Sequence, residues 1–141
     1  MQQTFIKSIG KQSPKWFIID ANDQILGRLA TKVSLTLMGK NKKTYIPFLE
    51  NGNKVIIINA DKIRVTGRKN VQKKYYRHSG RPGGMKIEKF NSLIERRPEK
   101  IIESAIRGML PKNKLGRIYF KNLTVCKGDD HKYASQKPIF L

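Results

Sequence analysis

Val55-Ile56-Ile57-Ile58 is the most apolar strand-like stretch of this 141-residue chain. Its β-branched side chains favour extended backbone, and an apolar run without alternation is typical of a strand that is covered on both faces. A similar run, Trp16-Phe17-Ile18-Ile19, lies nearer the amino terminus. These two runs predict two buried strands of one α/β sheet.

The segment between the two runs predicts a helix. Residues 20–23 suit a tight turn, and Asp23 is a suitable N-cap because its carboxylate can accept hydrogen bonds from the first free backbone N–H groups. Gly39 suits the helix end because it adopts the left-handed conformation at little cost. Between them, apolar residues recur at helical spacing and form one stripe, made by Ile25, Leu29, Val33 and Leu37.

The remaining apolar patterns predict two further strands and three further helices. Pro98 is well placed as the first residue of one helix, and Pro111 brings that helix to an end. The other expected elements are strands at 63–66 and 123–126 and helices at 88–97 and 115–122. Because strands and helices alternate without a repeat or an interdomain linker, we expect one α/β domain over residues 1–141.

The two ends of the chain are more polar than its middle. Residues 1–15 carry scattered lysines and precede the first apolar run, so we expect an extended arm there. Residues 129–141 follow Gly128 and are also largely polar. We expect them to form an extended tail that lies on a partner.

The chain is strongly basic, with 30 Lys and Arg against 10 Asp and Glu and a formal net charge of +20. Such self-repulsion favours a partner that carries an excess of phosphates. No apolar run approaches the length of a membrane span, and no secretory segment is visible, so we expect no membrane partner. The single cysteine, Cys126, lies in an apolar run and is interpreted as core filler, which fits either a reducing compartment or indifference to redox.

Lys73 to Lys86 concentrates cations, aromatic rings and glycines in what the sequence predicts to be a loop. Nine basic residues and no acidic one occur from Lys62 to Lys86. The loop can hold RNA in three ways. Guanidinium groups can bind phosphates, aromatic rings can stack on unpaired bases, and glycine backbone can approach phosphates closely. The residues expected in these roles are Arg77 and Arg81 for phosphates, Tyr75, Tyr76 and His78 for bases, and Gly80, Gly83 and Gly84 for positive φ and close approach.

Further basic residues extend the expected RNA-binding surface beyond this loop. They fall near the first helix, before and within the central loop, and around the last helix. They are Arg28, Lys40, Lys42 and Lys43; Arg68, Lys69, Lys73, Lys74 and Lys86; and Lys112, Lys114, Arg117 and Lys121.

Enzyme and cofactor signatures are missing from the sequence. The glycine-rich loop lacks both the P-loop ending and the spacing of a dinucleotide turn. His78, His131 and Cys126 are isolated from one another and do not have zinc-ligand spacing, so we expect no metal, no cofactor and no small-molecule substrate. Two rival functions remain open: an RNA-processing enzyme that uses His78 as acid or base, and a DNA-binding regulator that uses basic helices.

Taken together, the motifs resemble the bacterial and organellar family of large-subunit ribosomal protein thirteen. The resemblance covers almost the whole chain, including a carboxyl-terminal signature whose parts occur in the family's order. That signature is Ile106-Arg107-Gly108-Met109-Leu110-Pro111, Gly116-Arg117, Leu123-Thr124-Val125 and Lys127-Gly128. Other family-like pieces are 16–21, 26–30, 55–60, 65–67 and 75–84. The chain departs from the family pattern at Cys126 and at His131-Lys132-Tyr133.

The resemblance implies a three-layer α/β/α domain around a small, mostly parallel four-stranded sheet. It implies a structural, non-catalytic constituent of the large ribosomal subunit that acts in translation, contacts ribosomal RNA and neighbouring ribosomal proteins, and helps early subunit assembly. The run from Tyr75 to Lys86 is most similar to the cyanobacterial and plastid branch, and Lys outnumbers Arg. We therefore favour a plastid ribosome over a ribosome of the bacterial cytoplasm.

Overall fold

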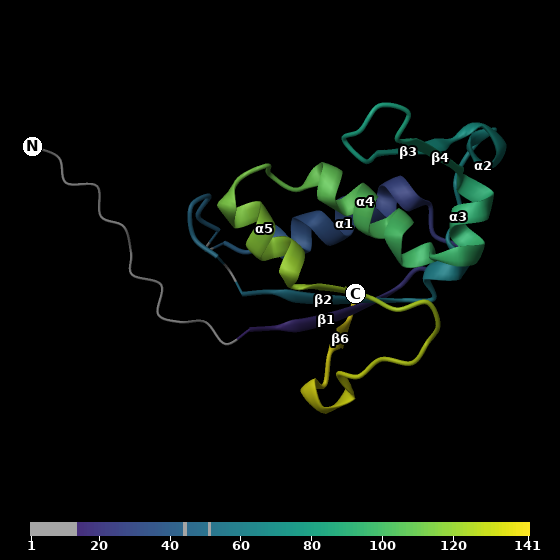
Figure 1. Cartoon of the computed structure of the whole chain (residues 1–141). Coiled ribbons are helices and arrows are strands. Elements are labelled where there is room, and N and C mark those ends of the chain that lie inside the picture. Colours follow the sequence, from purple (N-terminus) through teal and green to yellow (C-terminus); the bar gives the residue numbers. More distant parts are fainter. Residues whose placement is uncertain (1–13, 44, 51) are drawn as a thin grey trace, which may run out of the picture.

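The computed structural model describes residues 14–43, 45–50 and 52–141. Its centre is a four-stranded parallel sheet in the order β5-β2-β1-β6 (Figure 1). The predicted amino-terminal arm, residues 1–15, lies almost entirely outside the described residues. The α/β class and the parallel four-stranded sheet that were expected are both confirmed.

The two most apolar runs form the two central strands. β1 (Trp16–Asp20) pairs with β2 (Lys54–Ile58), and Ile19 lies opposite Ile57. β5 (Leu123–Val125) pairs with the other side of β2, and β6 (Ile139–Phe140) pairs with the other side of β1. Because β1 and β2 have a neighbour on each side and cover on both faces, their side chains are apolar without alternation.

Three helices cover one face of the sheet, and a fourth helix packs against one of them. α1 (Leu26–Met38), α4 (Pro98–Met109) and α5 (Lys114–Lys121) lie above the strands in Figure 1, and α3 (Phe90–Arg96) precedes α4. The main core joins helix residues to the upper face of the sheet, and its fully buried side chains include Ile19, Leu29, Val33, Leu37, Val55, Ile57, Ile101, Ile102 and Ile106. Burial of each such side chain stabilises the fold by roughly 1.5–3 kcal/mol before entropy is counted.

The opposite face of the sheet is covered by the carboxyl-terminal segment. Ile18, Ile56 and Ile58 form a second cluster, against which Trp16, Cys126 and Tyr133 pack. The Trp16 and Tyr133 ring centroids lie 4.8 Å apart. The chain beyond β5 contains only one short 3-10 helix, η2 (Ala134–Gln136), before β6. The expected second helical layer is thus formed here by an irregular segment, which Figure 1 shows below the sheet.

This arrangement corrects the prediction for the carboxyl-terminal tail. Residues 129–141 were expected to be extended on a partner, whereas Phe17 pairs with Ile139, and the Leu141 N–H donates to the Ile18 carbonyl at 3.1 Å. The tail therefore folds back onto its own sheet. Its Ile139 and Phe140 side chains nevertheless remain more than half exposed, at 54% and 72%.

The predicted strand at 63–66 is wrong. Arg64 forms only an isolated bridge with Ile25, and its N–H and C=O bind Gln24 and Leu26, at 2.9 Å each. This segment follows a 3-10 turn, η1 (Ala60–Lys62), and passes the start of α1 instead of joining the sheet. The fourth strand of the sheet is β6.

The ends of α1 show one correction and one confirmation. Asp23 is not the N-cap: it has φ of +58°, the cap position is Ile25, and no side chain caps the helix. The Asp23 carboxylate instead pairs with Arg64 at 2.8 Å. Gly39 ends the helix in the left-handed conformation as predicted, with φ of +71°. Pro98 is also confirmed as the first residue of α4.

Candidate nucleic-acid interface

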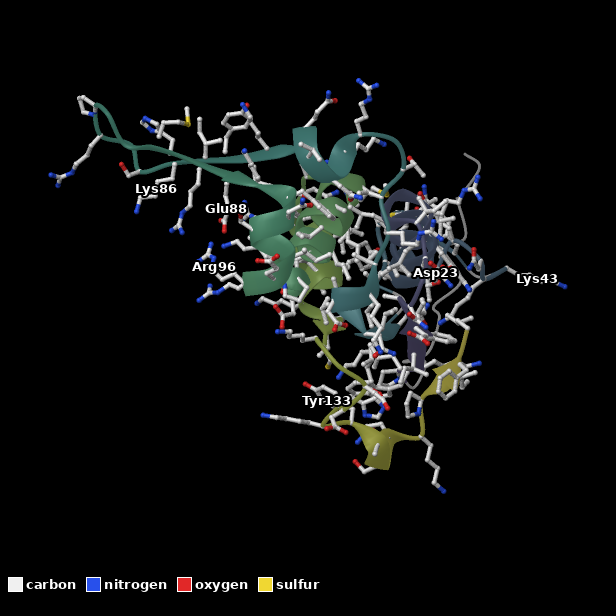
Figure 2. All side chains as sticks on the ribbon, turned by 90° about the vertical axis from the view of Figure 1, so that its right-hand side faces the viewer. Asp23, Lys43, Lys86, Glu88, Arg96 and Tyr133 are labelled. Carbon is white, nitrogen blue, oxygen red and sulfur yellow. The ribbon has the colours of Figure 1, made fainter. Side chains whose placement is uncertain are left out.

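The central basic stretch is a β-hairpin, not the predicted loop. β3 (Lys74–His78) pairs antiparallel with β4 (Met85–Lys89), so only residues 79–84 form a turn. A short helix, α2 (Lys69–Gln72), precedes the hairpin and carries the exposed Arg68 and Lys69 at its start. Figure 2 shows the hairpin, which carries Lys86, extending away from the rest of the ribbon.

The turn uses its glycines in two different ways. Gly80 and Gly83 have φ of +89° and +71°, as expected. Gly84 does not have positive φ, which corrects the prediction; a Cβ at Gly84 would instead lie 1.9 Å from the Ser79 hydroxyl oxygen. The Gly80 N–H donates a hydrogen bond to His78 Nδ1 at 2.9 Å, so the imidazole stabilises the turn.

Strand pairing gives the hairpin two different faces. Tyr76 lies opposite Ile87 on one face, and these side chains are 64% and 57% exposed. Tyr75 lies opposite Glu88 on the other face and packs against the main core. Burial raises the pKa of the Tyr75 hydroxyl. The two tyrosines, which were expected to act together, therefore do not share one surface.

Glu88 fixes the hairpin to the body of the fold. Its carboxylate accepts hydrogen bonds from the Arg96 guanidinium at 2.7, 2.8 and 3.0 Å. This pair raises the pKa of Arg96. In Figure 2, Lys86 and Glu88 lie on the side of the hairpin that faces Arg96. The Phe90 N–H, at the start of α3, adds a hydrogen bond to the Lys73 carbonyl at 3.0 Å.

Like charges stand directly opposite each other across the hairpin. Arg77 pairs in register with Lys86, and Lys74 pairs with Lys89. All four side chains are exposed. Like-charged residues in directly opposed positions destabilise a β-ladder, whereas an opposite charge there would stabilise it. The positive charges of the hairpin therefore lie at positions where they weaken the pairing of its own two strands.

A second basic surface is a cleft of about 710 Å³ between α4 and α5. Its lining includes four cationic side chains and the ring of Phe120, and no carboxylate is among the described residues that line it. The cations are Arg107, Lys112, Arg117 and Lys121. The Arg107 guanidinium carbon lies 5.8 Å from the centre of the Phe120 ring. Lys114, predicted for the same surface, is exposed on α5 but does not line the cleft.

The geometry of this cleft is fixed by the start of α5. The Asn113 side chain accepts a hydrogen bond from the Gly116 N–H at 2.8 Å and so caps the helix. Gly116 is required here because a Cβ would lie 1.7 Å from the Pro111 carbonyl oxygen. Arg107 was absent from the predicted site because the sequence places it on a helix that appeared to serve only the core. Its position in the Arg107-Gly108 pair, next to the basic segment 112–121, was the available signal.

A third group of predicted residues surrounds α1. Lys40, Lys42 and Lys43 follow the Gly39 cap, and Arg28 is exposed near the start of the helix. Burial, with a smaller contribution from the charge of Lys15, lowers the pKa of Lys42. In Figure 2, Lys43 lies on the opposite side of the molecule from Lys86. The predicted residues therefore form several separate basic surfaces, not a single patch.

The described residues do not offer features of the other site classes. Within residues 14–43, 45–50 and 52–141, no three His, Cys, Asp or Glu side chains gather as metal ligands. No helix in the same part of the chain is long and apolar enough to span a membrane. Cys126 is partly buried against the second cluster, and burial raises the pKa of its thiol.

Comparison with known proteins gives a consistent result. Residues 14–132 match the family model described as ribosomal protein L13. Similar proteins include the "Large ribosomal subunit protein uL13" of Acaryochloris marina, which is 56% identical over 100% of this chain and 93% of its own length. The proteins of the same name from Prochlorococcus marinus strain MIT 9301 and Crocosphaera subtropica are 56% and 57% identical, over 100% and 98% of this chain and 99% and 91% of their own lengths. The chain belongs to the ribosomal protein L13 family.

Proposed function

We propose that this protein is a structural constituent of the large ribosomal subunit, where it binds large-subunit ribosomal RNA through several basic surfaces. The L13 family is structural and not enzymatic. The names of the relatives support the subunit, and the cyanobacterial sources of those relatives agree with a plastid or a bacterial ribosome. Neighbouring large-subunit proteins are the expected protein partners.

The observation that carries the RNA-binding proposal is the charge arrangement of the hairpin. Arg77 faces Lys86 and Lys74 faces Lys89 across the two strands. Because side chains alternate along a strand, the two pairs lie on opposite faces of the hairpin, and a phosphate bound at either pair would turn that repulsive pair into a site with a shared anionic partner. Guanidinium and ammonium groups bind phosphate oxygens through charge-assisted hydrogen bonds.

The distribution of basic residues supports a role in organising RNA. The hairpin, the α4–α5 cleft and the segment after α1 are held by one parallel sheet and its helices. A rigid body with basic surfaces on different sides can join RNA segments that are far apart in sequence. We propose that residues 1–141 act as one such domain and that the protein joins the RNA early in subunit assembly. Recognition would rest on RNA shape more than on base sequence.

A salt titration tests the RNA-binding proposal. Purified protein is bound to transcribed large-subunit RNA fragments, chosen by cross-linking the protein in the purified particle and sequencing the attached RNA. If about eight phosphates are engaged, the slope of log affinity against log salt should be of order −7. A slope near zero, or cross-links that reach no large-subunit RNA, would contradict the proposal.

A further inference from the structure

Gly108, in the last turn of α4, has no structural explanation within the described part of the protein. It does not have positive φ, and the helix is capped at Leu110 with φ of −77°, so Gly108 is not needed to reverse the chain. A Cβ at Gly108 would meet no atom within 4 Å. Glycine also weakens a helix relative to alanine. The fold thus keeps a bare helix surface that it does not use itself.

This bare surface lies in the α4–α5 cleft. Gly108 lines the cleft together with Arg107, Lys112, Arg117 and Lys121. The volume of about 710 Å³ falls within the range of roughly 300–1,000 Å³ that is typical of small-molecule and cofactor sites. Since none of the described lining residues carries a negative charge, the cleft favours an anionic occupant.

Gly108 and Gly116 differ in what a side chain would meet at each position. Both glycines line the cleft, but a Cβ at Gly116 would clash with Pro111, whereas a Cβ at Gly108 would enter open space. Gly116 therefore lets two parts of this chain approach each other. At Gly108 no other part of the described chain takes up the space that a side chain would fill.

We propose that the α4–α5 cleft is the seat of a single RNA sugar–phosphate strand, which lies against the bare helix surface at Gly108 while the surrounding cations bind its phosphates. This inference rests on the proposed RNA-binding function and assigns one site to it. RNA is favoured over an acidic protein segment because its backbone carries a negative charge at every nucleotide, and all four charged side chains that line the cleft are cations. Arg107 and Phe120 would form one wall.

The test adds volume at Gly108 without changing charge. Gly108→Ala and Gly108→Leu should leave the melting temperature unchanged or raise it by up to roughly 4 °C, because both residues favour helix over glycine. Both should weaken binding to the cross-linked ribosomal RNA fragment, by roughly tenfold or more for leucine and less for alanine. The salt slope should stay as in the wild type, since no cation is lost.

Gly128→Ala is the matched control, because its Cβ would also meet no atom within 4 Å and it lies outside the cleft. Its RNA affinity should equal that of the wild type. Cleavage of the bound RNA by hydroxyl radicals adds a local readout: Gly108→Leu should expose a short run of sugars that the wild type protects, while protection elsewhere is kept.

The possible results separate the two proposals. If the wild type binds the RNA and Gly108→Leu binds equally well with the same protected sugars, the cleft assignment is wrong and the general RNA-binding proposal stands. If Gly108→Leu keeps its RNA affinity but no longer retains a ribosomal protein in the particle, the occupant is protein, and the assignment is again wrong. If the wild type itself shows no salt-dependent binding, both proposals fail.

Discussion

Glu88 on β4 and Arg96 on α3 form a bidentate pair that ties the projecting hairpin to the helical layer, with a shortest separation of 2.7 Å. The Arg96 side chain is 60% exposed and that of Glu88 is 31% exposed, so water weakens the pair. Its effect should therefore be on the orientation of the hairpin more than on the stability of the whole fold.

The first prediction concerns this link. A double variant, Glu88→Ala with Arg96→Ala, keeps the net charge and should speed hydrogen exchange of the β3–β4 amides. The midpoint of thermal unfolding should change little, because exposed ion pairs contribute little to global stability. Exchange of the β1–β2 amides is the internal control. Unchanged exchange in the hairpin would show that Tyr75 and the Phe90 hydrogen bond hold it without the ion pair.

The second prediction concerns the phosphate contacts of the hairpin. Arg77→Ala with Arg81→Ala should weaken RNA binding, since each charge-assisted contact contributes on the order of 1.5–3 kcal/mol before screening. The salt slope should become shallower by about 0.7–0.9 for each lost phosphate contact. Gly83→Val should weaken binding without changing the slope, because φ of +71° is strained for a branched residue. Filter binding over a salt series measures both effects.

The third prediction separates an RNA clamp from an RNA-processing enzyme. His78→Gln keeps a hydrogen-bond acceptor for the Gly80 N–H and should leave RNA affinity nearly unchanged. An enzyme that depended on His78 would instead lose catalysis while keeping affinity. RNA affinity and RNA cleavage should be measured on the same fragment. Specific cleavage by the wild type that disappears in His78→Gln would refute the structural role.

The fourth prediction tests the centre of the sheet. Ile57 is fully buried between β1 and β5, so Ile57→Asp would place an unpaired carboxylate in the core and should unfold the domain. Ile57→Val removes one methylene and should cost only about 0.5–1.5 kcal/mol. Circular dichroism during heating distinguishes the two variants. Cooperative melting of Ile57→Asp near the wild-type temperature would show that the core can accommodate the charge.

The fifth prediction concerns acid stability at the turn after β1. The Asp20 carboxylate accepts hydrogen bonds from the Asn22 N–H and from the Asn59 side chain, at 2.9 Å each, and these bonds lower its pKa from 3.8. A lowered pKa in the folded state means that the ionised form stabilises the fold above pH 3.8 and that this contribution is lost as the pH falls through the folded-state pKa. Asp20→Asn should remove this dependence. The melting temperatures of the two proteins should differ at neutral pH and converge below pH 3.8; a constant difference would exclude the carboxylate as the cause.

Local patterns were sufficient to predict most of the regular elements. The runs at 16–19 and 55–58 identified β1 and β2, because a buried parallel strand must be apolar on both faces. The helical stripe from Ile25 to Leu37, with Gly39 after it, identified α1. These signals lie within each element and do not depend on the rest of the chain.

The errors arose where pairing between distant residues decides the structure. β6 contains two residues, and its formation depends on β1, so Ile139 and Phe140 gave no strand pattern of their own. The hairpin was missed because its six-residue turn, rich in glycine, obscured the alternation in Met85 to Lys89. The separation of Tyr75 from Tyr76 follows from that pairing. Arg107 and Gly108 became recognisable as parts of a site only when α5 was placed beside α4.

The pairing of Phe17 with Ile139 also affects the order in which the protein can fold during its own synthesis. Ribosomes add about 5–20 residues per second, so β1 and β2 become available on the order of ten seconds before β6. Throughout that interval the outer edge of β1 lacks its neighbour, and the face that carries Ile18 and Ile56 lacks Tyr133. A nascent chain can therefore assemble the helical side of its sheet first and must complete the other side last. An unpaired strand edge invites association with other chains, so rapid capture of the emerging protein by RNA or by a chaperone would protect it at the stage when it is most vulnerable.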